Sequence, residues 1–200
     1  MQTGRIFTPF RLGKFIIMPE GMELPAGGGI PIYLGRKGAF GSGEHETTAA
    51  CLEQLENMTS IHGQRVLDLG SGTGILAIAA LLLGAGSAVA VDIEWPAAVS
   101  CSMNIALNNV QDRILTVCGE LAALADTGFD LVIANIYADI LLPLADRLVE
   151  LTLPGGFILL SGIPLQDKYD VWQRYTSLGC SQVDSRIGEE FVTYLLRKQP

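Results

Sequence analysis

The fold is decided by residues 66–74, which read Val-Leu-Asp-Leu-Gly-Ser-Gly-Thr-Gly. A short apolar run over 65–69, followed by glycine at every second position, predicts a β-strand that ends in a tight turn, because glycine tolerates positive φ and lets a ligand approach the backbone. The apolar run from Ile75 to Leu83 then predicts a helix that Gly84 ends. Its N-terminal amides would point toward the same turn.

Further strands and helices alternate on the C-terminal side of this unit, and a helical pattern precedes it from Glu44 to Met58. This alternation predicts an α/β fold, a doubly wound and mainly parallel seven-stranded sheet with helices on both faces. Two final strands without a helix between them predict a C-terminal hairpin, and so one antiparallel strand. The predicted strands are 65–69, 87–91, 114–117, 129–134, 157–160, 181–187 and 191–196; the predicted helices after residue 74 are 75–83, 95–107, 138–151 and 165–178; a turn is predicted at 154–156.

Residues 1–40 differ from the rest of the chain. Short strands are predicted at 15–18 and 30–34, with Pro31 favouring an edge position for the second. Such a β-type lead-in is too short to hold a core alone. We therefore divide the chain into the lead-in, 1–40, and a main domain, 41–200.

Composition and charge exclude several classes of protein. The chain has 200 residues, 49% of them hydrophobic, and a formal charge of −8. Its 13 basic residues are scattered, which argues against a nucleic-acid surface. The apolar stretch 69–93 holds five glycines and divides into a helical and a β-type run, so a buried helix and strand are predicted in place of a membrane span.

The cysteines and histidines predict neither a metal site nor a disulfide framework. The four cysteines lie far apart without a CxxC pair, and the chain has only two histidines. Reduced, mostly buried thiols are typical of a cytoplasmic protein. The N-terminus lacks the charged and apolar regions of a signal peptide.

The glycine spacing and two aspartates predict the type of ligand. The spacing fits neither the GxGxxG of nicotinamide binders nor a P-loop. Asp68 precedes the glycines, where its carboxylate suits a cationic or hydroxyl-bearing ligand better than a pyrophosphate. Asp92 ends the next strand, the position at which an acidic residue binds ribose hydroxyls in doubly wound nucleotide sites. This order of elements favours an adenosine-type ligand over a purely structural turn.

The combination resembles class I S-adenosylmethionine-dependent methyltransferases, with their Rossmann-like methyltransferase fold. The resemblance implies that Gly70, Gly72 and Gly74 pass close to the amino-acid part of the cofactor, with Asp68 near its ammonium group. It implies that Asp92 holds both ribose hydroxyls. Glu120 follows the third main-domain strand, where this class often contacts adenine; the other interpretation of Glu120 is a solvated helix start.

Three further segments indicate which family of these methyltransferases the chain resembles. Residues 40–48 read Phe-Gly-Ser-Gly-Glu-His-Glu-Thr-Thr, residues 130–138 read Asp-Leu-Val-Ile-Ala-Asn-Ile-Tyr-Ala, and Leu-Pro-Gly-Gly at 153–156 leads to Leu-Leu-Ser-Gly-Ile at 159–163. Together with 68–74 they resemble the PrmA family, which methylates large-subunit ribosomal protein eleven; some relatives methylate lysines of an electron-transfer flavoprotein. The resemblance runs from about Arg11 to the C-terminus.

The resemblance implies a cytoplasmic methyltransferase that acts on protein amines, at a lysine or an N-terminus. Phe40 and Thr48 would contact the cofactor, Phe40 by covering it and Thr48 through its hydroxyl. Asn135, at the end of a strand, would contact the cofactor and, as the catalytic residue, accept a hydrogen bond from the incoming amine. His45 is either a loop or helix-cap residue or a participant in the reaction.

Two alternatives and one departure accompany this prediction. A small-molecule methyltransferase of the same fold, or a catalytically silent cofactor-binding module, would share most of these motifs. The PrmA family carries an N-terminal domain that captures the ribosomal substrate, and about ten residues precede the matching region here, so we expect that domain to be absent. The sequence does not indicate the oligomeric state.

Overall fold

The computed structural model describes residues 7–25, 27–35, 45–125 and 128–200. The strands are β1 (Phe10–Leu12), β2 (Phe15–Pro19), β3 (Ile30–Leu34), β4 (Arg65–Leu69), β5 (Ser87–Asp92), β6 (Ile114–Cys118), β7 (Phe129–Asn135), β8 (Thr152–Pro164), β9 (Cys180–Ile187) and β10 (Phe191–Lys198). The α-helices are α1 (Glu46–Asn57), α2 (Ile75–Leu82), α3 (Trp95–Leu107), α4 (Ala138–Leu151) and α5 (Lys168–Ser177), and the short 3₁₀ helices are η1 (Gln111–Arg113) and η2 (Leu121–Ala123).

The predicted seven-stranded sheet is confirmed. Its strand order is β6-β5-β4-β7-β8-β10-β9. β4, β5, β6, β7 and β8 pair in parallel, while β10 lies between β8 and β9 and is antiparallel to both. The chain runs outward from β4 to β6 and returns to β7, so β4 and β7 are neighbours at the point where the strand order reverses. Ligands of open α/β sheets bind at such a point.

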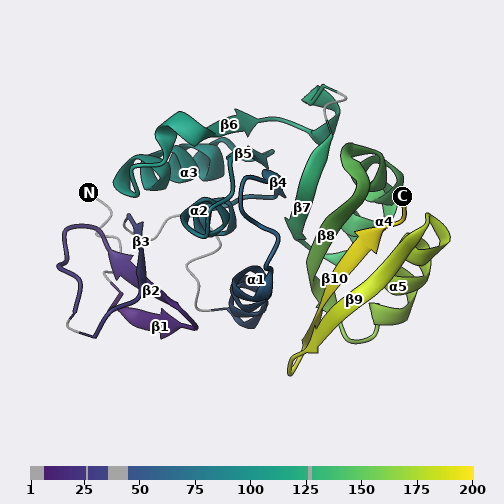
Figure 1. Cartoon of the computed structure of the whole chain (residues 1–200), viewed down its shortest axis with the longest axis horizontal. Helices are drawn as coiled ribbons and strands as arrows, with labels where there is room; N and C mark the ends of the chain where they lie inside the picture. The colour runs from purple at the N-terminus through teal and green to yellow at the C-terminus, as the bar shows by residue number, and fades with distance from the viewer. Residues whose placement is uncertain (1–6, 26, 36–44, 126–127) are drawn as a thin grey trace.

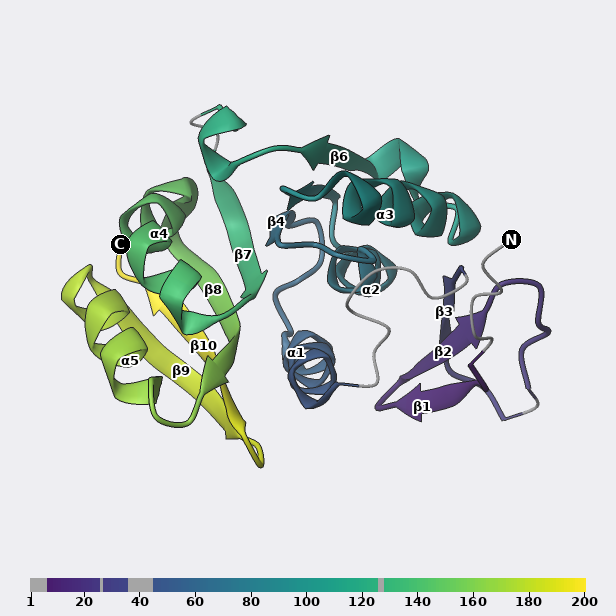
Figure 2. The same ribbon diagram turned by 180° about the vertical axis from the view of Figure 1, so that it is seen from behind.

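The sheet separates two hydrophobic cores because successive side chains of a strand point to opposite faces. In β4, Val66 packs into the first core and Leu67 into the second. Helices α1, α2 and α3 cover the first face, and α4 and α5 cover the second (Figures 1 and 2). Burial on both faces explains the long apolar runs of these strands.

Most predicted ends differ from the structure by at most two residues, and two predicted elements, the strand 157–160 and the helix 165–178, differ by more. The predicted turn at 154–156 lies within β8, where the pairing register with β7 shifts between Phe129 and Leu131 and Gly155 has a φ of +77°. The last helix begins at Lys168, three residues later than predicted, because Leu165 and Asp167 first form a turn: the Leu165 amide donates to the Glu190 carbonyl and the Asp167 amide to that of Pro164.

The lead-in forms a three-stranded sheet of order β1-β2-β3, with β3 at an edge as Pro31 predicts. Phe15, Ile17, Ile32 and Leu34 are buried in the first core together with α1 and α2. The proposed boundary between 1–40 and 41–200 stays a prediction.

Two buried asparagines, Asn104 in α3 and Asn108 at its C-cap, connect this helix to β3 and to the glycine-rich turn. The Asn108 side chain accepts a hydrogen bond from the Tyr33 amide at 2.9 Å and donates to the Tyr33 carbonyl at 2.7 Å. Asn104 accepts from the Gly35 amide at 2.8 Å and donates to the Thr73 carbonyl at 2.8 Å. The two side-chain amides thus provide hydrogen-bond partners for backbone groups of β3, of Gly35 and of the glycine-rich turn. The lead-in and the turn are therefore held to the same helix.

Within the ranges that the structure describes, no helix is long and apolar enough to cross a membrane. The apolar stretch 69–93 forms α2 and β5, as predicted.

Replacing Asn108 with Ala should lower the free energy of unfolding by about 2–3 kcal/mol, because two backbone groups of Tyr33 lose their partner. Urea denaturation checks this value. Asn57→Ala, at the exposed end of α1, is the control and should change stability by less than about 0.5 kcal/mol. Equal stability of the two variants would show that the Asn108 hydrogen bonds contribute little.

Candidate active site at the sheet switch point

A cavity of about 600 Å³ opens at the carboxyl edge of β4, β5 and β7. Polar groups from all three strand ends reach it, and the apolar side chains around them come from the segments that follow the strands. Its lining residues are Leu69, Gly70, Gly72, Asp92, Ile93, Glu94, Pro96, Ala97, Glu120, Leu121, Ala122, Asn135, Ile136, Tyr137, Ile140 and Leu144. The sequence predicts five of these as site residues: Gly70, Gly72, Asp92, Glu120 and Asn135.

Close packing requires the glycines of the turn. Gly70 has a φ of +69°, and a Cβ atom there would lie 2.4 Å from Cγ2 of Ile136. Gly74 caps α2 in the left-handed conformation, with Sγ of Cys101 2.5 Å from the position of a Cβ. The turn therefore presents bare backbone to the cavity at Gly70 and Gly72, while Gly74 faces α3 and does not line the cavity.

Asp92 is held in place by backbone amides. Its Oδ2 accepts from the Gly72 amide at 2.9 Å, and its Oδ1 accepts from the Glu94 amide at 3.0 Å. A carboxylate has about four lone-pair sites, so each oxygen has a further site for a ligand hydroxyl. The fixed carboxylate suits two adjacent hydroxyl groups.

Asp68 lies behind the glycine turn and does not line the cavity. Its side chain is buried, and its Oδ2 accepts from the Ala77 amide of α2 at 3.1 Å. Burial raises the pKa of this carboxyl to about 7; the Ala77 hydrogen bond lowers it, and the charge of Asp92 raises it. Asp68 therefore carries a proton over much of the acidic range when the protein has no ligand.

The remaining predicted cofactor contacts, Thr48, Glu120 and Phe40, differ in where they lie. Thr48 is buried in α1 and outside the cavity lining, and its Oγ1 has no hydrogen-bond partner among the described residues. Glu120 lines the cavity and also directly precedes η2. Its position is therefore compatible both with an adenine contact and with a solvated helix start. Phe40 lies outside the described residues.

His45 is a helix cap. Its Nδ1 accepts from the Thr47 amide at 3.4 Å at the start of α1 and lies 2.9 Å from Oγ1 of Thr47. Its ring also packs edge-on against Phe191, with centroids 5.3 Å apart. A second, small cavity of about 30 Å³ is lined by His45, Thr47, Asn135, Ile136, Tyr137, Gly162 and Phe191.

The sequence did not point to Tyr137 or Phe191. Tyr137 is 59% exposed. The feature of the sequence that could have identified it as a site residue is its position two residues after Asn135. Phe191 begins β10, and only the pairing of β10 with β8 brings it to the strand ends.

The described cysteines are unbonded thiols, and three of the four are buried. Burial raises the pKa of Cys51 to about 12 and that of Cys101 to about 11. Among the described residues, no group of three or more His, Cys, Asp or Glu side chains is placed to hold a metal ion.

Replacing Asp68 with Asn should change how stability depends on pH. The carboxyl ionises near pH 3.8 in the unfolded chain and near pH 7 in the folded one, so the folded state binds more protons between these values. The free energy of unfolding of the wild type should then fall as pH rises from about 4 to 7, by up to about 4 kcal/mol from this group. The advantage of Asp68→Asn over the wild type should grow across that window and level off above it.

Urea unfolding of both proteins without cofactor, at steps from pH 4 to 8, measures this difference. A difference that stays constant with pH would show that Asp68 ionises at the same pH in the folded and unfolded chain.

Comparisons with known proteins agree with this geometry. A ribosomal protein L11 methyltransferase of Pelobacter propionicus is 44% identical over 198 residues, which cover 96% of this chain and 64% of that protein. One of Chromohalobacter salexigens is 40% identical, covering 86% of this chain and 58% of that protein. The chain thus spans about three fifths of the length of these curated relatives.

Solved structures extend the comparison. The crystal structure of a ribosomal protein L11 methylase from Lactobacillus delbrueckii subsp. bulgaricus superposes with a TM-score of 0.88 at 29% identity, covering 97% of this chain and all of that one. An RNA methyltransferase from Salinibacter ruber in complex with S-adenosyl-L-homocysteine shares the fold, with a TM-score of 0.61 at 16% identity over 74% of this chain and 90% of that one. The model of the family described as ribosomal protein L11 methyltransferase (PrmA) matches residues 2–199, and the chain belongs to this family.

Proposed function

We propose that this chain transfers a methyl group from S-adenosylmethionine to an amine nitrogen of a protein, at a lysine or an N-terminus. The observation that carries the proposal is the cavity at the switch point, where the fixed carboxylate of Asp92 and the amide of Asn135 line one space beside a side-chain-free turn. Membership of the PrmA family supports the same activity.

The residues present fit the proposed cofactor. Asp92 would accept hydrogen bonds from both ribose hydroxyls, and the bare backbone at Gly70 and Gly72 leaves room for the amino-acid part. Glu120 and the apolar side chains of Ile93 and Leu121 would surround the adenine.

Three other residues are proposed as cofactor contacts on the family resemblance. Phe40 would cover the cofactor, and the Thr48 hydroxyl, which has no hydrogen-bond partner among the described residues, would hydrogen-bond to it. Asp68 would act across the turn on the ammonium group. A cation there favours the ionised carboxylate, so cofactor binding would lower the raised pKa of Asp68.

The residues of this chain position and prepare the amine. When bound, S-adenosylmethionine would supply a methyl group on a sulfonium: the lone pair of the amine nitrogen would attack the methyl carbon in line with the carbon–sulfur bond, and S-adenosylhomocysteine would leave as a neutral thioether. Lysine ordinarily has a pKa near 10.4, so its ammonium must first lose a proton, to solvent in this proposal. The Asn135 amide oxygen would accept a hydrogen bond from the nitrogen and orient its lone pair, and the apolar walls favour the neutral amine.

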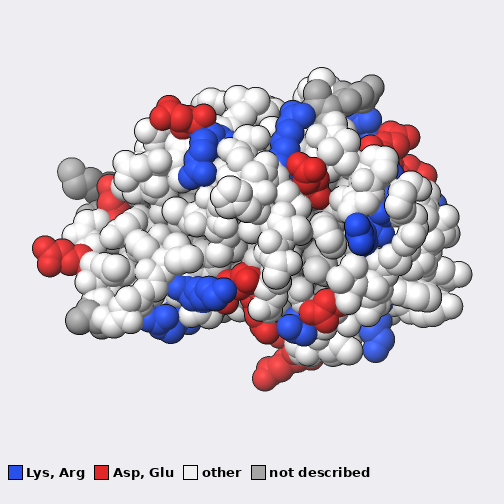
Figure 3. All heavy atoms as spheres, viewed as in Figure 1, with Lys and Arg blue, Asp and Glu red and all other residues white. Residues whose placement is uncertain are grey.

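A ribosomal protein is the proposed acceptor, because the relatives that cover most of this chain are named for one. Such an acceptor also supports a cytoplasmic location. The acidic chain favours a basic protein partner over nucleic acid. On the face shown in Figure 3, lysines and arginines are interspersed with acidic side chains and form no continuous basic patch.

Replacing Asp92 with Ala should weaken binding of S-adenosylhomocysteine about 100-fold, because two charge-assisted hydrogen bonds to the ribose are lost. Asn135→Ala should slow methyl transfer at least about tenfold while the affinity for S-adenosylhomocysteine stays within about twofold. Isothermal titration calorimetry measures binding, and transfer of labelled methyl groups to purified ribosomal protein L11 measures activity.

The controls separate the alternatives. Asn57→Ala should leave both binding and transfer unchanged. Equal loss of binding and transfer in Asn135→Ala would contradict the role assigned to Asn135. Cofactor binding without transfer to any protein would contradict the proposed function, and label on small molecules alone would indicate the small-molecule methyltransferase instead.

A further inference from the structure

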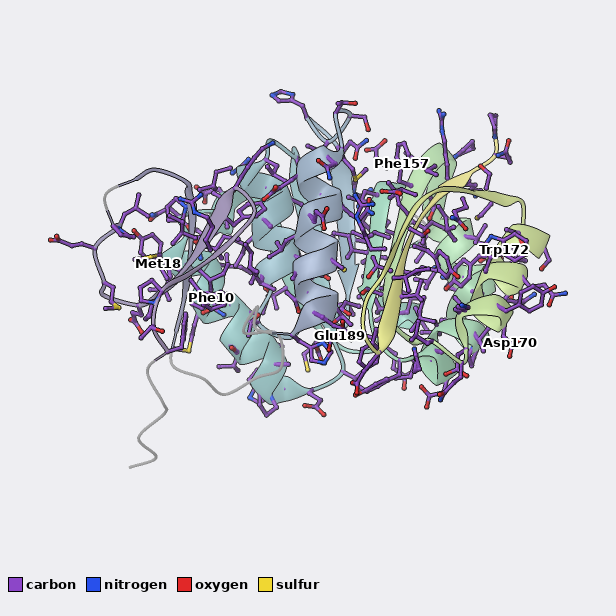
Figure 4. All side chains as sticks on the ribbon, turned by 90° about the horizontal axis from the view of Figure 1, so that it is seen from below. Phe10, Met18, Phe157, Asp170, Trp172 and Glu189 are labelled. Atoms are coloured by element: carbon purple, nitrogen blue, oxygen red, sulfur yellow. The ribbon has the colours of Figure 1, made fainter. Side chains whose placement is uncertain are left out.

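A second large cavity shares lining residues with the small cavity beside Asn135. This space of about 540 Å³, here called the α1 groove, is lined by Leu12, Gly13, Glu46, Thr47, Ala49, Ala50, Glu53, Arg186, Ile187, Gly188, Phe191 and Thr193. Its walls are the β1–β2 turn, one face of α1 and the β9–β10 hairpin. Figure 4 looks along this side of the molecule, with Glu189 at the hairpin tip beside the start of α1.

The three cavities share lining residues in series. The α1 groove and the small cavity share Thr47 and Phe191. The small cavity and the cofactor cavity share Asn135, Ile136 and Tyr137. The small cavity is therefore bordered by residues of both larger cavities, and Asn135 lines it as well as the cofactor cavity.

The lining of the α1 groove combines small and apolar side chains with the carboxylates of Glu46 and Glu53. Ala49, Ala50 and Phe191 supply uncharged surface. Carboxylates outnumber basic groups on the α1 and hairpin side. The guanidinium group of Arg186 already forms ion pairs with the carboxylates of Glu53, at 3.3 Å, and Asp184, at 3.2 Å. The acidic residues of this side are Glu46, Glu53, Asp184, Glu189 and Glu190, while the basic residues Arg11 and Lys14 belong to β1 and to the β1–β2 turn.

The hairpin wall is fixed against α1. The Glu46 carboxylate accepts from the Glu189 amide at 2.9 Å and the Glu190 amide at 3.1 Å. This contact uses the backbone of the hairpin tip and leaves the side chains of Glu189 and Glu190 exposed. These two exposed side chains, here called the acidic wall, follow the lining residue Gly188 and flank the groove. The backbone that carries them is already held against α1, which reduces the entropy lost on binding.

We infer that the α1 groove binds a basic, lysine-bearing segment of the protein acceptor, and that the target lysine reaches Asn135 through the small cavity between Tyr137 and Phe191. This inference rests on the proposed function. A basic segment matches the acidic wall, whereas a second copy of this chain, with its charge of −8, would be repelled.

The small cavity suits a lysine side chain. Its volume of about 30 Å³ accommodates a water-sized group such as an amine nitrogen. Phe191, held edge-on by the His45 ring, offers apolar surface to the methylene stem, and Tyr137 stands at the opening. Aromatic rings also attract the ammonium form before it loses its proton.

Filling the α1 groove tests the inference. Ala50→Trp should lower kcat/KM for purified ribosomal protein L11 at least about tenfold, mostly through KM, because a large side chain occupies the space of the acceptor. The affinity for S-adenosylhomocysteine should stay within about twofold of wild type. Ala106→Trp, on the exposed surface of α3, is the matched control and should leave kcat/KM unchanged.

Neutralising the acidic wall tests the inference without changing the shape of the groove. The double variant Glu189→Gln and Glu190→Gln should raise KM for the same acceptor about threefold to tenfold, and the difference from wild type should shrink as salt rises. Asp170→Asn, on α5 and away from the groove in Figure 4, should leave KM unchanged.

The outcomes separate the two proposals. If the wild type transfers no methyl group to a protein, the proposed function fails. If it does and both groove variants match it, the acceptor enters elsewhere and the inference fails. A wild type that dimerises in sedimentation analysis while Ala50→Trp stays monomeric would also overturn the inference, because a second copy would then occupy the groove. Thermal unfolding of each variant confirms that it is folded.

Discussion

The packing of Ile136 between two glycines is the constraint on which the site depends. A Cβ at Gly70 would lie 2.4 Å from Ile136 Cγ2, and a Cβ at Gly162 would lie 2.8 Å from the Ile136 carbonyl oxygen. Both glycines also have positive φ, so any other residue would meet strain and a clash together. The glycine turn after β4 and the strand end of β8 thereby hold the residue that follows Asn135. The proposed cofactor turn and the proposed amine contact are one packed unit.

The sequence predicted this unit in part because its signals are local. Glycines after an apolar run and an aspartate at the end of the next strand are features of short segments, and parallel pairing brings their ends to one edge of the sheet. The single antiparallel strand followed from two strands without a helix between them. Phe191 gave no such signal, since its place beside His45 depends on pairing between strands far apart in sequence.

Asp68 shows where a motif alone is insufficient. The motif identifies a carboxylate before the glycines, but strand alternation turns it toward α2, away from the cavity surface, and buries it. Its hydrogen bond to the Ala77 amide gives it a structural role at the first turn of α2, which favours negative charge. Burial opposes that charge and is the larger effect, because the pKa is raised despite the hydrogen bond. In the proposed complex, the ammonium group of the cofactor would favour the ionised form of this carboxyl.

In-line displacement requires the nucleophile to approach the methyl carbon from the side opposite the leaving sulfur, which a single cavity with one opening would make difficult for a protein acceptor. Here the segment Asn135–Tyr137 forms a common wall between the cavity proposed for the cofactor and the small cavity that leads to the α1 groove. In the proposed arrangement, donor and acceptor would enter by separate routes and meet at Asn135. The proposed acceptor route is built from α1 and the C-terminal hairpin, so the sheet would position the donor while these flanking elements would select the partner.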